Sequence, residues 1–139
     1  MNFLLDTNVV SEWVKPSPNL GVISWLAYID EDRVFLSVIT LTELRYGIER
    51  MQPGQRRKNL AEWLEHDLPM RFEGRILGID PSVADVCGSL IARSEGVGRP
   101  IDVTDAFIAA IAHVCDCTIV TRNVSDFESV TRKVLNPWR

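Results

Sequence analysis

Residues 2–8 read NFLLDTN, a short apolar run that stops abruptly at Asp6. The run is typical of a buried β-strand, and residues 7–14 continue as a helix that Pro16 and Pro18 end. In open parallel α/β sheets, ligands bind beyond the carboxyl ends of the strands. Asp6 is therefore a candidate functional residue, although an Asp at this position also caps the following helix well. The two roles are compatible.

The same alternation of short apolar runs and helical stretches continues to the end of the chain. It predicts a three-layer α/β fold in one domain, residues 1–139, around a central, mostly parallel sheet of four to five strands. Further strands are expected at 34–37, 75–79, 118–120 and 133–135, and further helices at 20–29, 39–51, 55–67, 81–95 and 105–115.

Composition restricts the kind of function. The formal net charge of −4 argues against a protein that binds nucleic acid by overall charge. It leaves room for an enzyme acting on nucleic acid, because divalent cations invert the local field. A zinc site is hard to assemble from two separate histidines and three cysteines that lack a CxxC spacing. Any metal should therefore be a hard cation held by oxygens. The apolar start is too short for a signal peptide or membrane span, which predicts a cytoplasmic protein without membrane association.

Asp105 has the strongest physical case as a functional acid. Ile108, Ala109 and Ala112 follow it at helical offsets of three, four and seven, so the carboxylate shares the face of the buried stripe. A carboxylate that points toward a core is costly unless it is paired or binds a metal. Thr104 can cap this helix, so capping does not explain Asp105.

Two further acids follow predicted strands. Glu43 lies on the helix after the second strand, where an ordinary exposed glutamate is the better interpretation of this residue taken alone. Asp126 follows the strand at 118–120, with Asn123 nearby to orient a ligand or water, although Asx residues in turns are often structural. Asp80 is explained by capping a helix, and Asp102 lies in a polar loop and is expected to be solvated.

The acids are more informative together than singly. Several carboxylates at successive strand ends suit Mg²⁺- or Mn²⁺-assisted hydrolysis of phosphodiesters. We therefore predict that Asp6, Glu43, Asp105 and Asp126 form a catalytic metal site, with Thr7, Asn8, Arg122 and Asn123 supporting it.

Four segments carry a resemblance that covers almost the whole chain. They read LLDTNVVSE (4–12), SVITLTELRYG (37–47), DAFIAA (105–110) and TRNVSDF (121–127). They resemble the PIN-domain toxins of the VapC family, and the ending NPW (136–138) is similar to the FitB-like branch. The resemblance implies a PIN-like α/β/α fold and the toxin of a type II toxin–antitoxin system. Such a toxin is an Mg²⁺-dependent endoribonuclease that cleaves RNA.

The resemblance also implies partners. These toxins are usually homodimers held inactive by a small DNA-binding antitoxin of the VapB or FitA kind, and the toxin–antitoxin complex can assemble on operator DNA. A helical pair like 39–67 typically forms the groove for the antitoxin, and Leu60, Trp63 and Leu64 are candidates to line it. The nearby basic residues would guide RNA or contact an acidic partner, or simply form a solvated face: Arg45, Arg50, Arg56, Arg57 and Lys58.

The family's metal-binding acids correspond to Asp6, Glu43 and Asp105. The position of the fourth acid varies among relatives, which carry it either where Asn123 or where Asp126 stands in this chain. Because residue 123 is an amide here, Asp126 is the better candidate.

Other readings of an acidic α/β pocket fit less well. A receiver-like Mg²⁺-binding signalling domain needs paired acids after the first strand and a late lysine, but this chain has a single acid and Thr121-Arg122. A haloacid-dehalogenase-like phosphatase needs Asp-x-Asp, whereas the chain reads Asp6-Thr7-Asn8. A catalytically inactive PIN binding module has little reason to keep all the acids.

Overall fold

The computed structural model describes residues 1–139 and contains one five-stranded sheet, in which every strand pair is parallel. The strand order is β3-β2-β1-β4-β5, so β1 is central, and the predicted fold class is confirmed. The strands are β1 (Asn2–Leu5), β2 (Val34–Ser37), β3 (Ile76–Leu77), β4 (Cys117–Val120) and β5 (Val134–Leu135).

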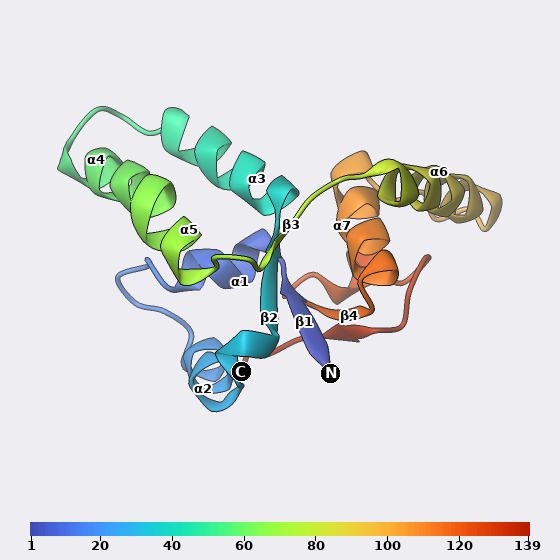
Figure 1. Cartoon of the computed structure of the whole chain (residues 1–139), viewed down its shortest axis with the longest axis horizontal. Coiled ribbons are helices and arrows are strands. Elements are labelled where there is room, and N and C mark those ends of the chain that lie inside the picture. The colour runs from blue at the N-terminus through green and yellow to red at the C-terminus, as the bar shows by residue number, and fades with distance from the viewer.

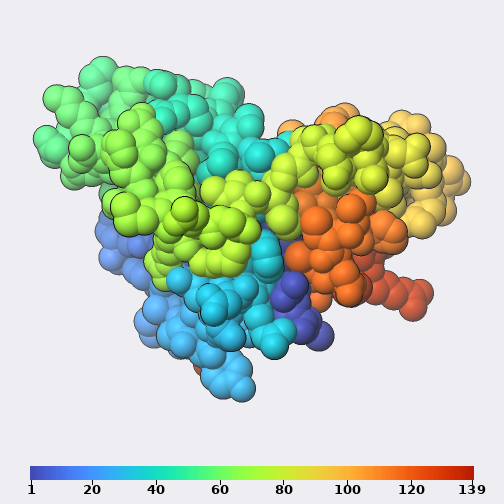
Figure 2. All heavy atoms as spheres, in the orientation of Figure 1, coloured from blue at the N-terminus to red at the C-terminus, as the bar shows by residue number.

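Helices cover both faces of the sheet, and Figure 1 shows them in two groups on either side of the strands. One group consists of α1 (Thr7–Glu12), α2 (Leu20–Tyr28), α3 (Val38–Glu49), α4 (Gln55–Glu62) and α5 (Leu68–Arg71); the other consists of α6 (Pro81–Gly96) and α7 (Val103–Val114). In the space-filling view a notch separates the two groups above the sheet (Figure 2).

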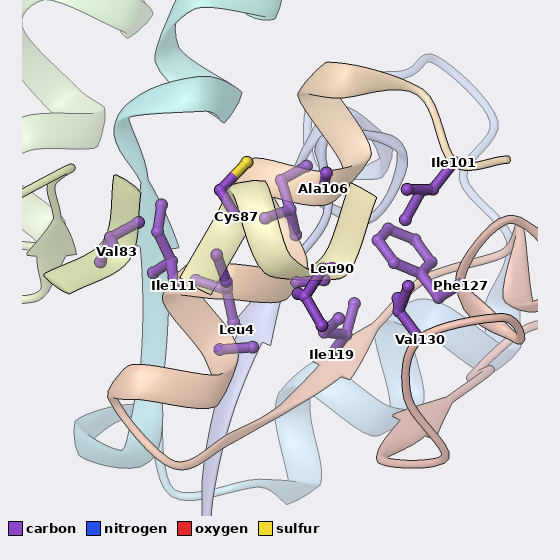
Figure 3. Close-up of a cluster of buried hydrophobic side chains, with 14 of the residues drawn as sticks. Leu4, Val83, Cys87, Leu90, Ile101, Ala106, Ile111, Ile119, Phe127 and Val130 are labelled. Atoms are coloured by element: carbon purple, nitrogen blue, oxygen red, sulfur yellow. The ribbon is translucent and has the colours of Figure 1, made fainter. Parts of the chain in front are cut away.

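Two apolar cores follow from the alternation of side chains along the strands. Leu4 and Ile119 point to the face covered by α6 and α7, where they join Leu90 and Ile111 (Figure 3). Phe3, Leu5 and Val120 point to the opposite face and belong to a second core with residues of the first helix group. Both cores hold the carboxyl ends of β1 and β4 in place.

Several helix boundaries differ from the predicted ones. Helix α1 ends at Glu12, two residues before the expected end. The helix expected at 55–67 continues through one π-helical turn (Trp63–Asp67) into α5. The wide turn precedes Pro69, which has no amide hydrogen and whose ring clashes with a regular turn before it.

The start of α7 also differs from the predicted start at residue 105 and from the predicted cap, Thr104. The helix begins at Val103, and its N-cap is Asp102 rather than Thr104. The backbone is still extended at Asp102 and turns helical at Val103, so Thr104 lies inside the first turn and cannot cap it. None of the helices has both the length and the apolar character that crossing a bilayer requires.

Candidate active site

Asp6 follows β1 directly and is almost fully buried. Its Oδ1 accepts a hydrogen bond from the Thr7 amide at 2.8 Å and so caps α1, as predicted. Its Oδ2 accepts from the Thr121 hydroxyl at 2.8 Å and more weakly from the Asn8 amide at 3.4 Å. Burial raises the pKa of Asp6, although the hydrogen bonds from Thr121 and Thr7 oppose this. Capping therefore leaves a functional role open to the same carboxylate.

The segment after β4 is joined to Asp6 through side-chain hydrogen bonds. Asn8 donates to the Thr121 hydroxyl at 3.3 Å and accepts from the Arg122 amide at 3.2 Å. The Asn123 amide donates to the same hydroxyl at 3.0 Å. Of this set, Thr121 was missed by the sequence reasoning. The signal was present, since it is a polar residue directly after an apolar strand and the structure buries it completely.

Glu43 is half-buried on α3 and faces α1. Its Oε1 accepts a hydrogen bond from the Thr7 hydroxyl at 2.6 Å, and that hydroxyl also lies 3.2 Å from the Thr40 hydroxyl. Ser37 caps α3 by accepting from the Thr40 amide, which fixes the helix at the carboxyl end of β2. Thr7 thus ties Glu43 to the residue that follows Asp6.

Asp105 lies in the first turn of α7, half-buried. Ile108, Ala109 and Ala112 are all buried, so the predicted inward face of the helix is confirmed. The carboxylate is therefore held on the side of α7 that faces the rest of the molecule.

The environment of Asp105 is strongly acidic. Burial is the largest cause that raises its pKa to about 7, followed by the charges of Asp6, Asp126, Asp102 and Glu43. Every cause acts in the same direction, and no basic side chain compensates. Asp102 was expected to be solvated; it is exposed, yet its charge acts on Asp105, which the sequence reasoning missed.

Asp126 reaches the same region from the short 3₁₀ helix after β4 (Val124–Phe127). Phe127 is fully buried and anchors this helix, while Asp126 is exposed. Asp126 also raises the pKa of Asp6, which places its charge beside two of the other acids. A polar cavity of about 350 Å³ lies against it, lined by Arg99, Pro100, Ile101, Asp102, Asp105, Ser125, Asp126 and Ser129.

These side chains offer the oxygen ligands that a hard divalent cation prefers, but they do not form a complete coordination shell. All the donors are carboxylate, hydroxyl and amide oxygens, which suit Mg²⁺ and Mn²⁺. Burial and then repulsion from the neighbouring carboxylates raise the pKa of Asp105, and a bound cation would relieve the repulsion. However, no three His, Cys, Asp or Glu side chains converge on one metal position. The fold brings the four predicted acids to one region without gathering them around a point.

The sequence matches the family model described as PIN domain over residues 3–133. The chain belongs to the PIN-domain family. Ribonucleases of the PIN-domain family are metal-dependent enzymes, in keeping with the acidic site. Membership in this family excludes the receiver and phosphatase readings.

Curated relatives of this PIN domain match it over nearly full length. The plasmid stability protein StbB of Pseudomonas syringae pv. tomato is 42% identical over 136 residues. Toxin FitB of Neisseria gonorrhoeae is 38% identical, and VapC ribonuclease Y4jK of Sinorhizobium fredii is 34% identical, both over 135 residues. These alignments cover 97% of this chain and 96–97% of each relative.

A solved structure agrees with this assignment. The PIN domain superposes on a chain of FitAB bound to an IR36 DNA fragment with a TM-score of 0.93 at 36% identity, covering 99% of this chain and 96% of the other.

Proposed function

We propose that residues 1–139 form a single PIN domain, which is the toxin of a type II toxin–antitoxin system. It hydrolyses RNA phosphodiester bonds at the site formed by Asp6, Glu43, Asp105 and Asp126, with Mg²⁺ or Mn²⁺ bound there. The observation that carries the proposal is the position of Asp105, whose pKa is raised first by burial and then by four neighbouring carboxylates that no basic group compensates. The names of FitB and VapC ribonuclease Y4jK support the toxin and ribonuclease parts.

The four acids would hold the ion through their carboxylate oxygens. When bound, it would neutralise charge on the scissile phosphate and favour deprotonation of the attacking water. Asp6 is kept in place by the Thr7 amide and the Thr121 hydroxyl, and Glu43 by the Thr7 hydroxyl. These bonds preorganise two of the acids before substrate arrives. Without a cation the pKa of Asp105 is raised to about 7, and a bound ion would favour its charged, metal-binding form.

A metal series on the purified protein tests the proposal. A labelled single-stranded RNA pool should be cleaved in Mg²⁺ and in Mn²⁺, and cleavage should stop in EDTA and return when Mn²⁺ is added in excess. Gel analysis of the products gives the rates. Equal cleavage in EDTA would contradict a metal site. No cleavage with either ion would favour the inactive binding module.

A second prediction concerns Thr7, which we assign a supporting role. Thr7→Val removes the hydroxyl that bonds Glu43 but keeps the backbone amide that bonds Asp6. We expect about a tenfold loss of kcat, the lower range for losing a residue that orients a metal ligand. Thr7→Ser keeps the hydroxyl and should stay near the wild-type rate. Equal rates for Thr7→Val and Thr7→Ser would show that this bond does not matter for catalysis.

A groove beside Glu43 is our proposed antitoxin site. It has a volume of about 280 Å³ and runs between α1, α3 and α4. Because Thr7 and Glu43 form one wall, a segment that fills it would also reach the acids and block them. Leu64, expected in the lining, is instead buried in the core. The groove is lined by Thr7, Ser11, Val14, Lys15, Glu43, Leu44, Gly47, Ile48, Met51, Arg56, Leu60 and Trp63.

The structure of FitAB bound to an IR36 DNA fragment supports the proposal that this chain has an antitoxin partner and binds DNA as part of a complex. We expect this chain likewise to pair with a small DNA-binding antitoxin, to dimerise, and to join a larger complex on operator DNA.

A further inference from the structure

The last four residues form a tail that is fixed to the start of α2. Asn19 donates to the carbonyl oxygen of Arg139 at 2.9 Å and accepts from the Arg139 amide at 3.3 Å. The tail passes so close to Gly21 that a Cβ there would lie 2.6 Å from the Pro137 oxygen. Figure 1 shows the C-terminus beside α2. A clamp of this kind holds the tail, including Trp138, in one position.

Trp138 in turn contacts an arginine from the candidate site. The guanidinium carbon of Arg122 lies 5.7 Å from the centre of the Trp138 ring, within the range of a cation–π contact. The backbone of Arg122 is bonded to Asn8, which also bonds Asp6 and Thr121. The Thr121 amide donates to Leu135, so the strand that leads to the tail adjoins the same segment. The backbone of Arg122 therefore borders the acidic site, and its side chain extends to Trp138.

The charge of Arg122 is available to a ligand. Its side chain is exposed, and no carboxylate forms an ion pair with it. The acids beside it repel a polyanion, because every charge that acts on Asp105 is negative. An arginine guanidinium offers several donors that match a phosphate group. A phosphate on a strand that approaches the acids would find this cation at their edge.

We infer that Trp138 is a positioning residue that holds the Arg122 guanidinium at the rim of the carboxylate site, where Arg122 binds a phosphate of the RNA substrate. The inference rests on the proposed ribonuclease function. Trp138 itself need not touch RNA. Its effect passes through Arg122, and the clamp formed by Asn19 and Gly21 keeps it in place.

The first test compares KM and kcat for cleavage of a labelled single-stranded RNA pool in Mn²⁺. Arg122→Gln should raise KM about five- to tenfold and leave kcat within about twofold. Trp138→Ala should raise KM about two- to fivefold, because the guanidinium is no longer held. Trp138→Phe keeps an aromatic face and should restore KM. Arg33→Gln is the matched control: Arg33 is exposed and directly precedes β2, so it lies at the amino ends of the parallel strands and its loss should leave KM unchanged.

Two further measurements separate positioning from a merely structural role. In a double-mutant cycle, Trp138→Ala should have almost no further effect on KM once Arg122 is Gln. Arg122→Gln should also lower the slope of the logarithm of RNA affinity against the logarithm of salt concentration by about 0.7, the value for one lost phosphate contact on a single strand, and Trp138→Ala should lower it by less. Gly21→Ala displaces the tail and should raise KM as Trp138→Ala does, whereas Gly88→Ala, with open space around its Cβ, should not.

The outcomes distinguish the inference about Trp138 and Arg122 from the proposed ribonuclease function. If the wild-type protein cleaves RNA but the Trp138 and Arg122 effects on KM are additive or absent, the inference is wrong and the proposed function stands. If the wild-type protein neither binds nor cleaves RNA, the proposed function fails and the inference fails with it.

Discussion

Asp105→Asn is expected to abolish RNA cleavage, with a loss on the order of 10³-fold, and at the same time to stabilise the metal-free protein at pH 8. Activity should fall because an amide cannot supply the charged oxygens that hold the ion. Stability should rise because the folded protein no longer has to bury a carboxylate among four others. Thermal unfolding in EDTA measures the second effect, and Asp85→Asn, an exposed acid on α6, is the control.

The pH dependence of stability follows from the same pKa. Asp105 titrates at about 7 in the folded protein, against an ordinary value of 3.8. Between these values the folded state binds more protons than the unfolded state, so stability falls as pH rises toward 7 and then levels off. Asp105→Asn should remove most of this slope. Asp6, whose pKa is also raised, leaves a smaller slope of the same sign. Equal slopes for both proteins would contradict the acidic environment described for Asp105.

Asp6→Ala should also abolish cleavage, and it should be less stable than Asp6→Asn, which lacks the same charge. Asp6 caps α1 through the Thr7 amide and accepts from the buried Thr121 hydroxyl. Asp6→Ala loses the helix cap, which should cost about 1–2 kcal/mol relative to Asp6→Asn, whose single carboxamide oxygen can still accept from the Thr7 amide. For a domain of this size that corresponds to roughly 4 °C or more in the midpoint of thermal unfolding.

The comparison between the two Asp6 variants isolates the structural role of this carboxylate. Both variants lack the charge and one of the two carboxylate oxygens, so both should lose cleavage, and only Asp6→Ala also loses the bond that caps α1. If Asp6→Ala and Asp6→Asn unfold at the same temperature, then capping by Asp6 contributes nothing to stability.

The positions of Asp6 and Asp105 in the fold could be predicted because the signals that place them are local. Asp6 directly follows an apolar strand, and the residues after Asp105 have a helical period that fixes its face. Both signals lie within a few residues of the acid. The parallel sheet also follows from local alternation, and it brings strand ends together wherever they stand in the sequence.

The bonds that orient the acids could not be predicted in the same way. Thr121 reaches Asp6 only because β1 pairs with β4, two strands more than a hundred residues apart. The bond from Thr7 to Glu43 likewise depends on how α1 packs against α3. No local pattern encodes either contact.

The predicted helix boundaries were wrong where two sequence signals favoured different ends. Both Asp102 and Thr104 are good capping residues, and the buried side chain of Ile101 ties down the chain just before Asp102. At the other helix, Leu64 and Leu68 are buried on either side of the π-helical turn. Packing of these two side chains carries the helix past the point where Pro69 predicts its end.

One assay tests the central claim most directly: the rate of cleavage of a labelled RNA pool by wild-type protein, Asp105→Asn and Asp85→Asn, each in Mn²⁺ and in EDTA. We predict that only the wild-type protein and Asp85→Asn cleave, that both do so only in Mn²⁺, and that their rates are equal. Cleavage by Asp105→Asn at the wild-type rate would contradict a ribonuclease site built on these carboxylates.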